Sequence, residues 1–189
     1  MNDHPNLVLI GFMGAGKSTI GRRCALRLGY QFRDSDTVIE QRHKKSIPEI
    51  FAGEGEAKFR EWECEVVHDL ARCSNMVIAT GGGIVLNSSN VARLRRSGIV
   101  VLLSAHADEI IARCMSRNTR PLLMTTDVDP VQRIVSMLEI RNPLYEAAAN
   151  ITVDTTGLDR EEAVERVLNE FNSQVNSWRK GHGKRAKSE

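Results

Sequence analysis

The chain has 189 residues, which is enough for one domain with a sizeable hydrophobic core. Hydrophobic residues make up 41% and charged residues 26%, and no apolar run approaches the roughly 20 residues of a membrane span. The net charge is +2, but residues 177–189 carry +4, so the rest of the chain carries −2. We therefore expect neither a membrane nor a nucleic-acid partner.

In chain order, strand and helix patterns alternate. β-Branched apolar runs predict buried parallel strands, and apolar residues at helical spacing between capping residues predict helices. The expected elements are a strand at 7–10, a helix at 20–28 closed by Gly29, a weak strand at 31–33, a short helix after the capping box Ser46/Glu49, a helix at 59–70, strands at 76–80 and 99–103, a helix from Pro130 to Leu138, a strand at 151–153, and a helix from the capping box Asp159/Glu162 to Phe171. This alternation predicts an α/β fold of three αβα layers, with a central parallel sheet of about five strands and helix-rich segments at 36–72 and 104–142.

The cysteines and histidines predict no metal or redox site. Cys24, Cys64, Cys73 and Cys114 form no CxxC pair and no zinc pattern, so we expect reduced thiols. The 5 histidines share no spacing typical of a metal site or a catalytic triad. The apolar run at 7–10 is too short for a secretory segment, and we expect a cytoplasmic monomer.

A phosphate-binding loop is the strongest motif in the chain. Residues 11–18, GFMGAGKS, match GxxxxGK[ST] and lie between a predicted strand and a predicted helix, as that motif requires. Its backbone N–H groups would face phosphate oxygens at the positive end of the helix dipole. Lys17 would reach the β- and γ-phosphates, and the Ser18 hydroxyl would bind Mg²⁺. The expected ATP-binding residues of this loop are Gly14, Ala15, Gly16, Lys17, Ser18 and Thr19.

Several classes of protein carry such a loop, and the rest of the chain favours a small-molecule kinase. The guanine-binding motif NKxD of GTPases is absent, and DTTG at 154–157 comes too late in the chain to be their switch motif. A motor or helicase would need a longer chain and a basic track, whereas 189 residues suit a kinase for a small acceptor.

Six motifs together resemble the shikimate kinases, P-loop enzymes of the nucleoside-monophosphate-kinase type. They are GFMGAGKST, DSD, FREWE, TGGG, RPLL and RNPLY, in that family's order and spacing. The resemblance runs from about Leu7 to Asp154. It implies that ATP, with Mg²⁺, phosphorylates the 3-hydroxyl of shikimate in aromatic amino-acid biosynthesis.

The resemblance also implies a division of the chain. Residues 1–175 would form a single kinase domain, in which 36–62 bind the acceptor and 115–127 form a lid over ATP. Independently of the resemblance, the basic composition of residues 176–189 and their lack of apolar periodicity predict a disordered tail.

The carboxylates of DSD receive separate roles from the resemblance. Asp34 would bind Mg²⁺ through water, and it would replace the acidic residue that is missing at the end of strand 76–80. Asp36 would hold substrate hydroxyls and act as the catalytic base. The alternative for Asp36 is a cap of the following helix.

Basic residues and glycines complete the implied site. Arg60 and Arg141 would bind the acceptor carboxylate, since a guanidinium matches a carboxylate bidentately, and Glu63 would hold Arg60 in place. Backbone N–H groups of the glycine loop would contact the substrate. Those glycines are Gly81, Gly82 and Gly83.

The nucleotide side is completed by residues later in the chain. Arg120 of the lid would neutralise charge on the γ-phosphate, and it forms the implied catalytic set with Lys17 and Asp36. Arg113 and Asp154 would flank the adenine, and Arg117 would be a solvated lid charge.

Two alternatives remain open. A kinase of the same fold would act on another small hydroxy acid such as gluconate. A non-catalytic, ATP-sensing regulatory module would use its basic tail as a binding arm. The presence of Lys17, Ser18, Asp34, Asp36 and Arg120 argues against the module, since an idle protein would be free to lose them.

Overall fold

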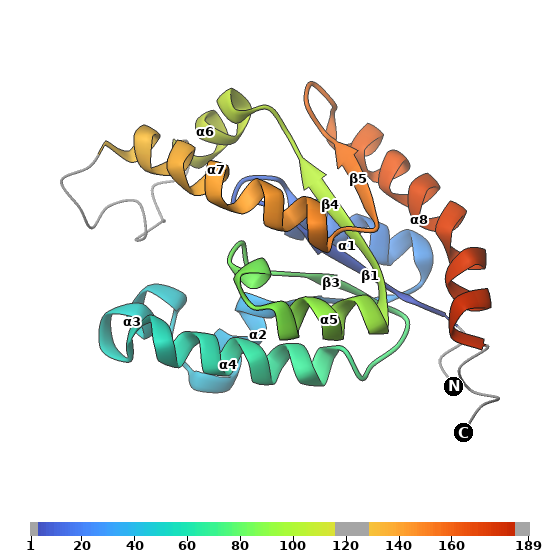
Figure 1. Cartoon of the computed structure of the whole chain (residues 1–189), viewed down its shortest axis with the longest axis horizontal. Coiled ribbons are helices and arrows are strands. Elements are labelled where there is room, and N and C mark those ends of the chain that lie inside the picture. Colours follow the sequence, from blue (N-terminus) through green and yellow to red (C-terminus); the bar gives the residue numbers. More distant parts are fainter. Residues whose placement is uncertain (1–3, 116–128, 184–189) are drawn as a thin grey trace.

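The computed structural model describes residues 4–115 and 129–183, and its centre is a five-stranded parallel sheet (Figure 1). The strand order is β2-β3-β1-β4-β5, and every neighbouring pair is parallel. The strands are β1 (Asn6–Ile10), β2 (Gln31–Asp34), β3 (Met76–Ala79), β4 (Gly98–Ser104) and β5 (Ile151–Asp154). The predicted three-layer fold with about five parallel strands is confirmed.

Helices cover both faces of this sheet (Figure 1). They are α1 (Lys17–Leu28), α2 (Ser35–His43), α3 (Ile47–Gly53), α4 (Gly55–Leu70), α5 (Ser88–Ser97), α6 (Ala107–Met115), α7 (Pro130–Ala148) and α8 (Arg160–Gly183), with a 3₁₀ turn, η1, at Ile84–Leu86. α1 and α8 pack together on one face, whereas α5 and α7 lie against the other and α4 packs on α5. Because both faces are covered, β1 and β3 are buried at every position, which explains their continuous apolar runs.

The order of the strands predicts a ligand site at the carboxyl ends of β1 and β3. β1 is followed by α1 on one face, and β3 leads to α5 on the other, so the chain leaves these adjacent strands in opposite directions. Open α/β sheets bind ligands at such a point, outside the carboxyl ends of the strands. The phosphate-loop motif follows β1, and the glycine loop follows β3.

The predicted helix boundaries hold where local capping determines them. Gly29 closes α1 in the left-handed conformation, with φ 67°, and Ser46 and Glu49 form the expected capping box at α3. Helix α5 was not predicted, because its sequence SSNVARLRRS has only two large apolar side chains, Val91 and Leu94.

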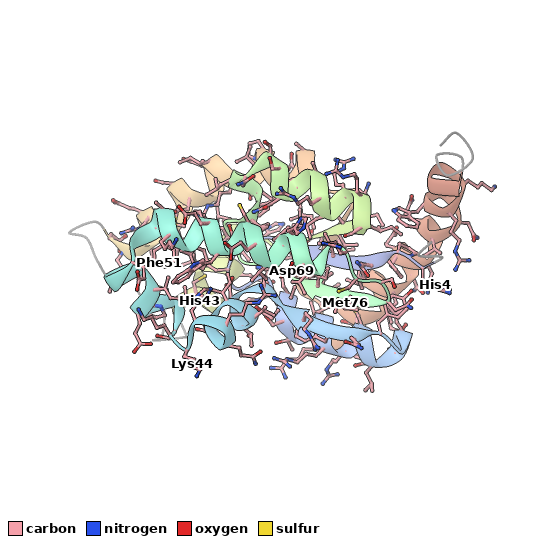
Figure 2. The ribbon with its side chains drawn as sticks, turned by 90° about the horizontal axis from the view of Figure 1, so that it is seen from below. His4, His43, Lys44, Phe51, Asp69 and Met76 are labelled. Atoms are coloured by element: carbon pink, nitrogen blue, oxygen red, sulfur yellow. The ribbon has the colours of Figure 1, made fainter. Side chains whose placement is uncertain are left out.

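The expectation of a disordered tail from residue 176 is wrong for the described part of that segment. Helix α8 continues to Gly183, because Val175 and Trp178 pack against the hydrophobic core. Arg179 Nη2 also lies 2.8 Å from His4 Nδ1, beside the beginning of β1 (Figure 2). The boundary predicted at residue 175 from charge alone overlooked these apolar contacts.

The layer formed by α2, α3 and α4 is seen from below in Figure 2, where His43 and Phe51 lie along α4. The ring of His43 stacks on Trp62, with 3.5 Å between the ring centroids, and Phe51 packs against Phe59. These contacts hold α2 and α3, in the first part of the expected acceptor segment 36–62, against α4. In the described ranges 4–115 and 129–183, no helix is long and apolar enough to span a membrane.

Candidate active site

A cleft of about 590 Å³ lies at the carboxyl ends of β1, β2 and β3. It is bordered by residues predicted for the donor and by residues predicted for the acceptor. These are Gly14, Gly16, Lys17, Ser18, Thr19, Asp34, Asp36, Arg60, Gly81, Gly82, Gly83 and Arg141. The fold therefore gathers most of the predicted site from segments far apart in the sequence.

The phosphate loop has the backbone conformation that its glycines predict. Gly14 and Gly16 adopt φ values of 86° and 90°, in the left-handed region that favours glycine. Lys17 begins α1 and donates hydrogen bonds to the Gly11 and Phe12 carbonyls at 2.7 and 2.9 Å. The loop thus holds the ammonium group against its own backbone, at the start of a helix whose dipole favours anions.

Ser18 and Asp34 meet beside this loop. Ser18 Oγ donates to Asp34 Oδ2 at 2.6 Å, while Asp34 Oδ1 accepts from the Asp36 and Thr37 N–H groups. Asp34 is therefore the cap of α2, and the alternative role of Asp36 as that cap is wrong. A hydroxyl and a carboxylate are hard oxygen donors, which suit Mg²⁺ bound mainly through water and phosphate.

Asp36 lies in the first turn of α2 and borders the cleft. Burial raises the pKa of its carboxyl from 3.8 to about 7, and the charges of Asp34 and Glu63 act in the same direction, whereas Lys17 lowers it. A carboxyl with a pKa near neutrality is suited to proton transfer at neutral pH.

The glycine turn, residues 81–83, packs against functional side chains on both sides. A Cβ at Gly81 would lie 2.6 Å from Asp36 Oδ1, and one at Gly83 would lie 2.5 Å from Arg60 Nη1. A Cβ at Gly82 would lie 3.4 Å from the Met13 backbone nitrogen. Glycine at 81 and 83 therefore leaves room for Asp36 and Arg60, whereas a Cβ at Gly82 would make only ordinary van der Waals contacts.

Ser35, between the two aspartates, is a residue that the sequence did not single out. It is fully buried, and its Oγ accepts a hydrogen bond of 2.9 Å from the Gly81 N–H. The same Oγ lies 3.4 Å from Asp36 Oδ1. The Gly81 N–H, expected to contact the substrate, is thus bonded to Ser35.

Arg60 and Glu63 form the predicted pair. Arg60 Nη1 lies 3.2 and 3.1 Å from the two carboxylate oxygens of Glu63, and its Nη2 lies 2.9 Å from Glu56 Oε1. Glu63 is only 1% exposed, and burial raises the pKa of its carboxyl while Arg60 opposes that change. This pairing explains a glutamate on the apolar stripe of α4.

Arg141 approaches the same turn from α7. Its Nη1 lies 3.5 Å from the Gly82 carbonyl oxygen, and its guanidinium lies 5.9 Å from the centre of the Phe12 ring. Tyr145, one helical turn further on, donates its hydroxyl to the same carbonyl. Tyr145 was not predicted, because its partner is a backbone atom that no sequence pattern reveals.

The predicted adenine residues are only partly brought together. Arg113 pairs with Glu109 at 2.5 Å and lines a second cavity of about 270 Å³, next to the phosphate loop. Thr155 also lines that cavity, but Asp154 does not, since its carboxylate accepts hydrogen bonds from Thr156. Arg117, Arg120 and the lid positions 116–127 lie outside the described residues.

The fold and the cleft define a P-loop phosphotransferase: a phosphate loop, two carboxylates and two arginines border one cleft. Residues 13–172 match the family model for shikimate kinase. The chain belongs to the shikimate kinase family.

Sequence and structure comparisons with individual proteins support membership of this family. A shikimate kinase from Thermodesulfovibrio yellowstonii is 42% identical over 166 residues, which cover 88% of this chain and 94% of the relative. The structure of a shikimate kinase from Acinetobacter baumannii in complex with shikimate has a TM-score of 0.85 at 37% identity and covers 90% of this chain and 94% of that one. A gluconokinase from Sinorhizobium meliloti shares only the fold, with a TM-score of 0.62 at 18% identity, over 94% of this chain and 97% of its own.

Proposed function

We propose that the protein transfers the γ-phosphoryl group of ATP to the 3-hydroxyl of shikimate, a step in aromatic amino-acid biosynthesis. The observation that supports this most directly is the position of Arg60 and Arg141 at one glycine turn, on the cleft that the phosphate loop also borders. Two guanidinium groups suit an acceptor that carries a carboxylate, which shikimate does. The relative from Acinetobacter baumannii, solved with shikimate, supports the same acceptor.

The donor side would be held by the phosphate loop. Lys17 would contact the β- and γ-phosphates, and residues Gly14 to Thr19 would direct backbone N–H groups at phosphate oxygens. Ser18 and Asp34 would hold Mg²⁺, which neutralises charge on the β- and γ-phosphates when it is bound. Arg120 is proposed, from its place in the RPLL motif alone, to contact the γ-phosphate.

The acceptor would be oriented by two arginines and activated by Asp36, which line the same cleft. Arg60, fixed by Glu63, and Arg141 would bind its carboxylate, so that the 3-hydroxyl faces Asp36. Asp36 would accept the hydroxyl proton as the oxygen attacks the γ-phosphorus in line with the departing ADP. ATP and shikimate are thus the proposed partners, and a monomer without nucleic-acid partners stays a prediction from the sequence.

An ADP-release assay with ATP, MgCl₂ and a panel of acceptors tests this function. Shikimate should give rapid release, and gluconate and other hydroxy acids should give little. Release with gluconate but not shikimate would leave the P-loop phosphotransferase intact and overturn the acceptor. ATP binding without acceptor-dependent release would favour the regulatory module.

The matched control for this assay is Lys17→Ala. The variant removes the ammonium group at the donor side and its two hydrogen bonds to the phosphate loop, and it keeps Arg60 and Arg141. We expect its turnover with shikimate to fall at least about 100-fold, since phosphoryl transfer depends on charge neutralisation. Turnover close to that of the wild type would remove Lys17 from the proposed mechanism.

A further inference from the structure

The Gly82 carbonyl receives two hydrogen-bond donors from one face of α7. Tyr145 donates its hydroxyl to this oxygen, and Arg141 Nη1 lies 3.5 Å from it. The two residues are four positions apart, which puts them on the same side of a helix. The short contact belongs to the tyrosine, whereas the arginine stands at the outer limit of hydrogen-bond distance.

The Gly82 carbonyl belongs to a turn that packs on the phosphate loop and is covered by α7. A Cβ at Gly82 would lie 3.4 Å from the Met13 backbone nitrogen and 3.8 Å from the Gly11 carbonyl oxygen, so the turn packs directly on the phosphate loop. Tyr145 is only 1% exposed, and α7 also packs on η1, which follows the turn. A backbone carbonyl in such surroundings needs a donor, because leaving it unpaired is costly.

The chemistry of the two donors differs. Burial raises the pKa of the Tyr145 hydroxyl to about 12, although the charge of Arg141 and its hydrogen bond to this hydroxyl oppose the change, so the group is a neutral donor throughout the working pH range. Arg141 carries a permanent charge and five N–H donors, which suit a carboxylate better than a single carbonyl. If Tyr145 lost its hydroxyl, the nearest donor able to satisfy the carbonyl would be the Arg141 guanidinium.

We propose that Tyr145 is a positioning residue: by occupying the Gly82 carbonyl, its hydroxyl keeps the Arg141 guanidinium available to the acceptor carboxylate. The inference rests on the proposed function for the identity of the acceptor. The competition between Tyr145 and Arg141 for the Gly82 carbonyl, in contrast, does not depend on which acceptor the protein phosphorylates.

Tyr145→Phe tests the proposal, because it removes one oxygen and keeps the buried ring. The loss of this hydrogen bond should raise the KM for shikimate about 5- to 10-fold. The KM for ATP and kcat should change less than about 2-fold, since the phosphate loop and Asp36 keep their contacts. The matched control is Tyr30→Phe, which removes a hydroxyl outside the cleft from a ring packed on Phe171.

A double-mutant cycle separates positioning from a general structural role. In an Arg141→Ala background, Tyr145→Phe should change kcat/KM for shikimate less than about 2-fold, because the residue acts through Arg141. An effect of the same size in both backgrounds, or an unchanged KM in the single variant, would overturn the proposal.

A crystal structure of Tyr145→Phe gives a readout that needs no turnover. The distance between Arg141 Nη1 and the Gly82 oxygen should shorten from 3.5 Å to the ordinary hydrogen-bond range of about 2.7–3.2 Å. An unmoved guanidinium would refute the competition. If the wild type does not phosphorylate shikimate, the proposed function fails, and this structural comparison still decides the role of Tyr145.

Discussion

Asp36→Asn should stabilise the ligand-free protein at alkaline pH while it abolishes phosphoryl transfer. The Asp36 carboxyl has its pKa raised from 3.8 to about 7, mainly by burial, so its ionised form is unfavourable in the folded state. Between pH 4 and 7 the folded chain keeps a proton that the unfolded chain has released. The free energy of unfolding therefore falls as pH rises through this window and becomes level above it.

The size of the effect follows from the pKa difference. Each pKa unit corresponds to about 1.4 kcal/mol, so at pH 8 the ionised carboxylate costs the folded state at most about 4 kcal/mol. Since the group borders the open cleft, this figure is an upper bound. The gain in the free energy of unfolding from Asp36→Asn should grow by up to about 3 kcal/mol between pH 5 and pH 8. At pH 5 the Asp36 carboxyl is still protonated in the folded state, so the wild type has lost only part of the stability that it loses by pH 8.

Urea denaturation at both pH values, with EDTA and without nucleotide or acceptor, measures this difference. Any hydrogen bond that the amide loses or gains affects both pH values alike, so the change with pH isolates the charge. Asp108→Asn is the matched control, since its side chain is exposed at the start of α6. A gain that is equal at pH 5 and pH 8, or larger at pH 5, would refute the reasoning.

Substitutions at two further residues, Arg60 and Ser35, probe the acceptor side of the cleft. Arg60→Ala should raise the KM for shikimate about 100-fold or more and leave the KM for ATP nearly unchanged, as measured by ADP release, because a paired charge is lost at the acceptor alone. Unchanged acceptor kinetics would remove Arg60 from the site. Ser35→Ala should lower kcat about 10-fold, because the buried Gly81 N–H loses its acceptor and Asp36 its neighbouring hydroxyl, whereas Ser35→Thr should retain activity. Equal losses in both Ser35 variants would contradict a role for the hydroxyl.

The sequence predicted those parts of the site whose causes are local. The GxxxxGK[ST] pattern between a strand and a helix identified the phosphate loop, and the buried runs at 7–10 and 76–80 identified two central strands. Glu63, one turn after Arg60, was predictable because helical spacing alone brings the two side chains together.

The parts that escaped prediction depend on partners distant in the chain. Ser35 bonds a backbone group 46 positions away, and Tyr145 bonds one 63 positions away. Backbone donors and acceptors are present at every residue, so no pattern of side chains marks which of them a hydroxyl will meet. The continuation of α8 to Gly183 was missed for a related reason, since Trp178 finds its apolar surroundings on other elements.

The crowding around the glycine turn also bears on how this family can change its acceptor during evolution. Each of the three glycines faces a different neighbour: Gly81 faces Asp36, Gly82 the phosphate loop and Gly83 Arg60. A side chain at Gly81 or Gly83 would press on Asp36 or Arg60, whereas a Cβ at Gly82 would make only ordinary contacts of 3.4 Å or more. Changes of acceptor preference are therefore expected first at Ile47 and Phe51, apolar residues that also line the cleft.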